Sequence, residues 1–183
     1  MMFYEDPFFW ALISMFSLVG AVALVGSKKM GRYQLLGIII VALFLLGRII
    51  LVLPFCPQPR FEVEGWNWAV GGIIFAIGLI FCIPGIPGLY IKPFTGPDEK
   101  VDIKNTGFYG IVRNPIYLGE ILWCLGWAVM FRSIIGVALV PMWWASLLFL
   151  IIIEEGSLER ELGKPYLEYK EKVRGRIIPG LPI

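Results

Sequence analysis

Two polar residues, Arg113 and Asn114, stand directly before Pro115, and an acid, Glu120, follows inside an apolar run. Proline is preferred in the first turn of a helix, so the pattern predicts a helix that begins at Pro115 and presents the polar pair at its start. The free amides at such a start attract anions, and the guanidinium fork suits a carboxylate or a phosphate. The alternative is an arginine that only anchors the chain at lipid head groups.

A pair of acids, Glu154 and Glu155, follows the apolar run 133–153. The C-terminal end of a helix disfavours negative charge, so two adjacent carboxylates there require a partner or full solvation. The candidate partners are Arg113 and a ligand with an ammonium group or ribose hydroxyls. Because both polar sites flank one helical hairpin, we expect them at the same level, with a polar pocket between them.

Glu120 and Arg48 are the two clear charges inside predicted spans. Charged residues at such depth are costly and usually face a cavity or each other, so each is a functional candidate. Glu120 lies three residues after Tyr117 and therefore on the same helix face. We interpret Glu120 as a candidate pocket and catalytic residue, and Arg48 as a structural residue with Glu120 as its candidate partner.

The composition indicates an integral membrane protein. Of 183 residues, 58% are hydrophobic and 16% are charged, with a mean hydropathy of +0.77, whereas soluble domains are about 45–50% apolar and 25% charged. The length predicts one domain, and the net charge of +2 implies no nucleic-acid partner. The chain has no histidine, and Cys56, Cys82 and Cys124 lack paired spacing, so we expect structural cysteines and no metal site.

Five apolar runs are long enough to cross a membrane, which takes about 20 helical residues. The predicted fold class is therefore all-α, a polytopic membrane protein with spans at 7–25, 34–53, 66–83, 116–131 and 133–153. Only Arg132 separates the last two, which predicts a tight hairpin. Two regions follow: 1–100, with three spans and a Pro/Gly-rich linker, and 101–183, with the hairpin and an interfacial helix interrupted near Gly163 and Pro165.

The distribution of basic residues predicts the orientation. Thirteen of the sixteen lysines and arginines lie in the first loop, between the third and fourth spans, or after the fifth. The positive-inside rule then places the N-terminus outside and the C-terminus in the cytosol. Glu5 and Asp6 precede the first run where a secretory signal would carry positive charge, so we expect that run to be a retained span.

The stretch NTGFYGIVRNPIYLG and, after the hairpin, EEGSLERELGKPYLEYKEKVRGRIIPG resemble the isoprenylcysteine carboxyl methyltransferase and phospholipid methyltransferase families of membrane enzymes. The resemblance extends from residue 105 to residue 180. The matching positions are Gly107, Tyr109, Arg113, Pro115, Tyr117, Gly119, Glu154, Glu155, Gly163, Tyr166, Tyr169 and Pro179.

The resemblance implies S-adenosylmethionine as the methyl donor, held at the cytosolic face by region 101–183, and a lipophilic acceptor that enters sideways from the bilayer. An S-adenosylmethionine-dependent methyltransferase is the function that we expect. The expected cofactor-binding residues are Gly107, Tyr109, Arg113, Asn114, Pro115, Tyr117, Glu154, Glu155, Tyr166 and Tyr169. The expected catalytic residues are Arg113, Asn114 and Glu120.

Two departures from the family pattern bear on the acceptor. The family histidine is Asn114 here, which forms hydrogen bonds but cannot titrate. The prenylcysteine enzymes usually carry an arginine shortly before the glutamate pair, where this chain has LLFLIIIEE. The second departure disfavours a prenylcysteine acceptor. The lack of histidine favours O-methylation of an acid, since a carboxylate needs no base.

Three alternatives to this function remain at this stage. One is a phospholipid N-methyltransferase. Another is an intramembrane NADPH-dependent reductase, because sterol reductases share a related C-terminal pattern, although the short chain and the adjacent glutamates argue against it. The last is a non-catalytic small membrane protein or transporter whose polar residues are only anchors.

Overall fold

The computed structural model describes residues 2–26, 34–63, 65–83, 103 and 106–182 of the chain. These residues form an all-α fold, which confirms the predicted class, with a single isolated bridge between Arg60 and Ser133. A short 3-10 turn, η1 (Phe3–Glu5), precedes seven helices in the described part. They are α1 (Pro7–Gly26), α2 (Gln34–Ile50), α3 (Trp66–Cys82), α4 (Phe108–Ile111), α5 (Pro115–Met130), α6 (Ile134–Leu162) and α7 (Lys164–Lys172).

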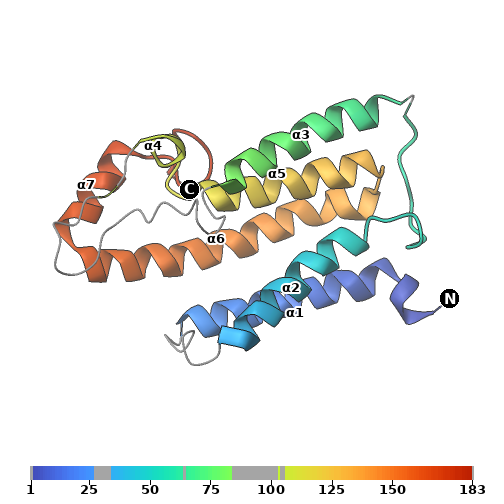
Figure 1. The fold of residues 1–183 in the computed structure, drawn as a ribbon, viewed down its shortest axis with the longest axis horizontal. Coiled ribbons are helices and arrows are strands. Elements are labelled where there is room, and N and C mark those ends of the chain that lie inside the picture. Colours follow the sequence, from blue (N-terminus) through green and yellow to red (C-terminus); the bar gives the residue numbers. More distant parts are fainter. Residues whose placement is uncertain (1, 27–33, 64, 84–102, 104–105, 183) are drawn as a thin grey trace.

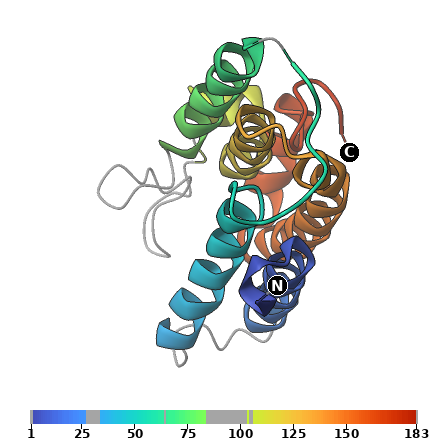
Figure 2. The same ribbon diagram turned by 90° about the vertical axis from the view of Figure 1, so that its right-hand side faces the viewer.

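The long helices form two groups. Helices α3, α5 and α6 run alongside one another, and the hairpin of α1 and α2 lies against them (Figure 1). Seen from the end, α5 lies between α3 and α6 (Figure 2). The small helices α4 and α7 and the C-terminal segment gather where α5 begins (Figure 1).

The five predicted spans coincide with α1, α2, α3, α5 and α6. Of the described helices, α6 alone, with 29 residues and a hydropathy of 2.3 over its best window, is long and apolar enough to cross a membrane. Helices α3 and α5 are apolar but have 17 and 16 residues. The number of spans therefore stays a prediction. Residues 84–100 of the predicted Pro/Gly-rich linker, which covers 82–100, lie outside the described residues.

Helix α6 continues well past the predicted end of the fifth span. It runs unbroken through Glu154 and Glu155 to Leu162. The stretch after the span is rich in glutamate, leucine and arginine, which are good helix formers, so the change from apolar to charged residues does not end the helix. Gly163 ends it with φ 60°, and Pro165 lies in the first turn of α7, so the predicted interruption at these residues is confirmed.

Close helix packing places α5 directly against α3. A Cβ atom added to Gly78 of α3 would lie 2.3 Å from the backbone nitrogen of Trp123. One added to Gly126 of α5 would lie 2.3 Å from the backbone nitrogen of Phe75. Only glycine permits such an approach, so these two positions fix the register of α5 on α3.

The ends of α2 and α5 are tied together on the side of the α5–α6 turn. The Arg60 guanidinium donates to the carbonyl oxygens of Leu53, at 2.9 Å, and Val52, at 3.2 Å, and also to that of Phe131. The turn itself is as tight as predicted, with Arg132 at φ 57°. These bonds hold α2 beside α5, which matters because the two helices share the charged pair described below.

Candidate functional site

Arg113 and Glu155 meet in a buried ion pair. The guanidinium donates from Nε to Glu155 Oε1 at 2.8 Å and from Nη2 to Oε2 at 3.3 Å. Arg113 is 7% exposed and Glu155 is 2% exposed. The paired geometry matches the fork of the guanidinium to the two carboxylate oxygens. Of the two partners considered for the glutamate pair, Arg113 is thus the one found for Glu155.

The remaining donors of Arg113 hold the C-terminal segment. Nη1 donates to the carbonyl oxygens of Val173, at 2.8 Å, and Arg174, at 2.9 Å, while the backbone N–H donates to Gly175 O at 2.8 Å. Four of the five guanidinium N–H groups are therefore engaged within the chain. Arg113 joins the start of α5, the C-terminal third of α6 and the segment after α7 into one unit.

Asn114 and Arg176 complete the shell around the same carboxylate. Asn114 Nδ2 donates to Glu155 Oε1 at 3.0 Å, and Arg176 Nε donates to Oε2 at 3.0 Å. The Asn114 amide also donates to Arg176 O at 3.2 Å. Glu155 consequently accepts four hydrogen bonds from three side chains, which is about as many as a carboxylate can take. Sequence reasoning missed Arg176, because nothing distinguished it from the other basic residues near the C-terminus.

Glu154 does not share the partners of Glu155 and contacts Tyr117 instead. Its Oε2 accepts a hydrogen bond from the Tyr117 hydroxyl at 2.8 Å, and the side chain is half-buried. No described residue donates to Glu154 Oε1. Successive helix residues diverge by about 100°, which explains why adjacent glutamates have separate partners. Of the two acids, Glu154 is the one that keeps an acceptor atom for a ligand.

The tyrosines of α7 pack the small helices together. Tyr169 donates from its hydroxyl to Tyr109 O at 2.9 Å, and Tyr166 and Tyr169 are 3% and 5% exposed. Burial raises the pKa of both phenols well above its usual range, so both stay neutral. Gly107, where φ is 60°, is the N-cap of helix α4. Tyr166 and Tyr169 pack against Val173, whose carbonyl oxygen binds Arg113, so these predicted site residues support the Arg113 cluster indirectly.

The charged pair predicted inside the spans is present. Arg48 Nη2 donates to Glu120 Oε2 at 2.5 Å, and Nη1 contacts Cys124 Sγ at 3.1 Å. The guanidinium also lies 3.7 Å from the centre of the Phe44 ring. Arg48 is 2% exposed, so the pair is desolvated and each charge depends on the other. None of its contacts involves Arg113, Asn114 or Glu155.

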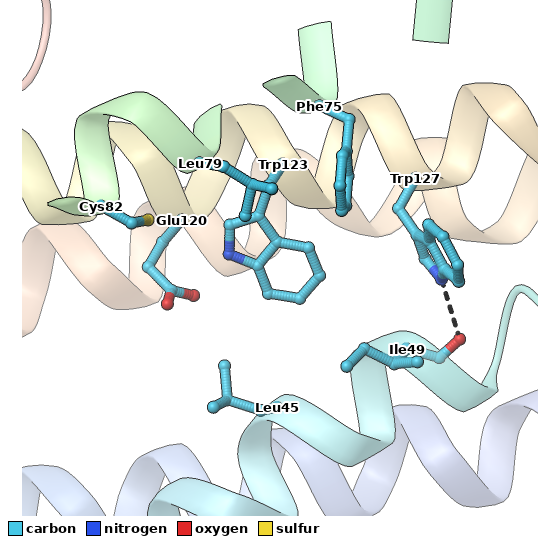
Figure 3. A pocket seen from close by; sticks show the side chains of 8 residues that line it. All are labelled: Leu45, Ile49, Phe75, Leu79, Cys82, Glu120, Trp123 and Trp127. Atoms are coloured by element: carbon cyan, nitrogen blue, oxygen red, sulfur yellow. Dashed lines mark hydrogen bonds between the residues drawn. The ribbon is translucent and has the colours of Figure 1, made fainter. Parts of the chain in front are cut away.

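A cavity of about 380 Å³ lies beside Glu120, between α2, α3 and α5 (Figure 3). Its walls are almost entirely apolar and aromatic, and Glu120 supplies the charged group. The lining residues are Leu45, Ile49, Phe75, Leu79, Cys82, Glu120, Trp123 and Trp127. A cavity of this size and character is typical of small-molecule sites. The structure thus separates a polar cluster, at the start of α5, from an apolar cavity deeper along the same helix.

Comparison with known proteins gives one match. A sequence model of the family described as phospholipid methyltransferase matches residues 66–165, more than half of the chain. The matched stretch runs from α3 to the start of α7 and includes Arg113 and Glu155, but not Arg176. No curated protein and no solved structure matches. The match confirms the resemblance that the motifs predicted.

Proposed function

The chain belongs to the phospholipid methyltransferase family, and from this membership we propose that it transfers a methyl group from S-adenosylmethionine to a lipophilic acceptor in a membrane. The observation that carries the proposal is the buried Arg113–Glu155 pair with Glu154 and Tyr117 beside it. These residues occupy the positions at which the motifs resemble the family, and the two partners of the ion pair, at the start of α5 and in α6, are 42 residues apart in the sequence.

The polar groups of Glu154 and Tyr117 fit such a cofactor. Within the described part of the chain, only Oε2 of Glu154 accepts a hydrogen bond, from the Tyr117 hydroxyl. Such a carboxylate and hydroxyl suit an ammonium group or ribose hydroxyls. S-adenosylmethionine would supply a methyl group on a positively charged sulfur. Asn114, by contrast, already uses its amide within the chain. We therefore assign Glu154 and Tyr117 to direct contact, and Glu155, Arg113 and Asn114 to positioning.

The positioning residues have a clear chemical purpose. Methyl transfer requires the nucleophile, the methyl group and the sulfur in line, and much of the rate enhancement can come from holding reactants in such a geometry. The network around Glu155 fixes the start of α5 to α6 and to the C-terminal segment. Glu154 and Tyr117 are attached to those same helices, so the network fixes them as well.

The membrane arrangement that we propose has several spans, with the N-terminus outside and the C-terminus in the cytosol. It is supported by the family, by the length of α6 and by the bias of lysine and arginine. In this arrangement the Arg113 cluster faces the cytosol, where a soluble cofactor is available, and the cavity lies at the depth of the hydrocarbon.

Two acceptor classes have separate support. The description of the family favours the amine of a phospholipid head group. The absence of histidine favours an acid, which needs no base. In an amine acceptor the proton would have to leave to a carboxylate such as Glu120, to a tyrosine or to water. The pH dependence of the transfer step separates these classes, as described in the Discussion.

The test is calorimetric binding of S-adenosylhomocysteine and, separately, of NADPH to the purified protein. We expect binding of S-adenosylhomocysteine alone, weakened in Glu154→Gln and unchanged in Glu168→Gln, a matched change on the exposed face of α7. Binding of NADPH instead would identify a reductase. Binding of neither compound would reject an enzyme of either kind.

A further inference from the structure

At both ends of the cavity between α2, α3 and α5, a hydrogen bond joins α2 to α5. At one end Arg48 of α2 binds Glu120 of α5. At the other end the Trp127 indole of α5 donates to Ile49 O of α2 at 3.1 Å, as Figure 3 shows. These bonds fix the distance between the two helices, so the space between them cannot close by a simple approach of α2 to α5.

The polar end of the cavity offers one acceptor and one donor. Glu120 Oε2 is taken by Arg48, but no described residue donates to Oε1. Likewise, no described residue accepts a hydrogen bond from Trp123 Nε1. Figure 3 shows the indole nitrogen on the side of the ring that faces Glu120. A single group that both donates and accepts would satisfy the two atoms.

The charge at this end excludes an ionic ligand group. Arg48 neutralises Glu120, so the pair attracts neither a cation nor an anion strongly, while bringing a further charge into an apolar cavity is costly. A hydroxyl or an amide carries a donor and an acceptor without charge. The rest of the cavity, from Leu45 to Trp127, offers only hydrophobic contacts to whatever is attached to that group.

The wall supplied by α2 lies outside the residues that match the family. Leu45, Arg48 and Ile49 precede residue 66, where the match begins. Leu79, on the opposite wall, is 47% exposed at the surface of the protein. One wall of the cavity is thus formed by residues outside the matched stretch, and the exposed Leu79 lies on the opposite wall.

We propose that this cavity binds one hydrocarbon chain next to a neutral hydrogen-bonding group, such as a hydroxyl or an amide, which pairs with Glu120 Oε1 and Trp123 Nε1. The chain extends along α5 toward Trp127, and Leu45 and Ile49 determine which chains fit. That this lipid is the methyl acceptor rests on the function proposed above: Tyr117 lies one helical turn from Glu120, so a reacting group beyond the neutral group would reach the Tyr117–Glu154 pair.

The probe is 1-dodecanol carrying a diazirine on its chain, photolysed with the full-length protein in nanodiscs and mapped by mass spectrometry. We expect labels on the cavity residues that excess 1-dodecanol abolishes and that dodecyltrimethylammonium leaves in place. Leu45→Phe should reduce this competable labelling by about tenfold, because a chain loses several methylene contacts. Leu46→Phe, on the exposed face of the same helix, should not reduce it.

Labelling that dodecanol does not compete, or that Leu45→Phe and the opposing Leu79→Phe both leave unchanged, would overturn the site. Trp123→Phe keeps the ring and removes the N–H, so it should abolish the preference for dodecanol over dodecane as competitor. An unchanged preference would overturn the assignment of the neutral group.

Binding of S-adenosylhomocysteine is measured on the same preparations, and it also reports that the cavity variants are folded. Competable labelling without such binding in the wild type retains the cavity site and rejects the proposed function. Binding of S-adenosylhomocysteine without competable labelling retains the proposed function and rejects the cavity site.

Discussion

Arg113 holds Glu155 through both carboxylate oxygens, at 2.8 and 3.3 Å, while the adjacent Glu154 is bound to Tyr117 on another side of α6. Two acids that look equivalent in the sequence therefore have different surroundings. Glu155 is buried and saturated with donors, whereas Glu154 is half-buried and its Oε1 accepts from no residue that the structure describes. Their substitution should affect different properties of the protein.

For Glu154→Gln we expect weaker cofactor binding in an intact fold. Loss of a hydrogen bond to a charged group costs about 1.5–3 kcal/mol, which is about 10- to 150-fold in the dissociation constant of S-adenosylhomocysteine. Titration calorimetry measures this constant, and the thermal midpoint should stay at the wild-type value. Wild-type affinity in this variant would remove Glu154 from the cofactor site.

For Glu155→Gln we expect loss of stability first. The change leaves the Arg113 guanidinium buried without its counter-charge, and breaking a buried pair in this way costs about 3–5 kcal/mol. For a chain of this size that corresponds to a fall of about 6–20 °C in the thermal midpoint. A variant with the wild-type midpoint but no cofactor binding would instead make Glu155 a direct ligand.

The C-terminal segment should be as important as the helices it joins. In Arg176→Gln, Glu155 loses one of its two charged partners, so the affinity for S-adenosylhomocysteine should fall by about tenfold or more. Arg174→Gln is the matched control, because that side chain is exposed and only its carbonyl oxygen is used. Equal affinities in the two variants would show that the segment does not organise the site.

Sequence reasoning found those features that residue type alone determines. Pro115 predicted the start of α5, Gly163 and Pro165 predicted a helix break that is now seen between α6 and α7, and two charges inside apolar runs predicted the Arg48–Glu120 pair. It could not find what depends on the path of the backbone. Arg113 binds the carbonyl oxygens of residues 173 and 174, and every residue carries such an oxygen, so no side chain marks the segment.

The division between Glu154 and Glu155 was missed for a related reason. Their directions depend on how α6 is rotated against α5, and we expected a helix end at these residues. Because the helix instead continues to Leu162, each side chain has one fixed direction. The walls of the cavity could not be predicted from the sequence either. Three helices form them, and the spacing of these helices depends on bonds such as that from the Trp127 indole to Ile49 O.

The Arg48–Glu120 pair allows a double-mutant test. Arg48→Met should destabilise the protein by about 3–5 kcal/mol, because it leaves the Glu120 carboxylate without its partner. Adding Glu120→Gln to that variant should recover part of the loss, since the unpaired charge is gone. Thermal or denaturant unfolding of the four proteins gives the coupling energy. Strictly additive effects would show that the two charges do not interact.

The last prediction concerns the chemistry of the acceptor. The chain has no histidine, the residue whose ordinary pKa lies between about pH 6 and 8. Tyr166 and Tyr169 stay neutral because burial raises the pKa of each phenol.

With a carboxylate acceptor, already ionised above a pKa of about 4, the single-turnover rate at saturating substrates should be nearly constant between about pH 6 and 8. An amine acceptor with a pKa of about 10 must first lose its proton, and its rate would then rise about tenfold per pH unit over the same interval. Rapid-quench measurement of methyl transfer therefore decides between the two classes: a constant rate supports O-methylation of an acid, and a rising rate supports the phospholipid amine.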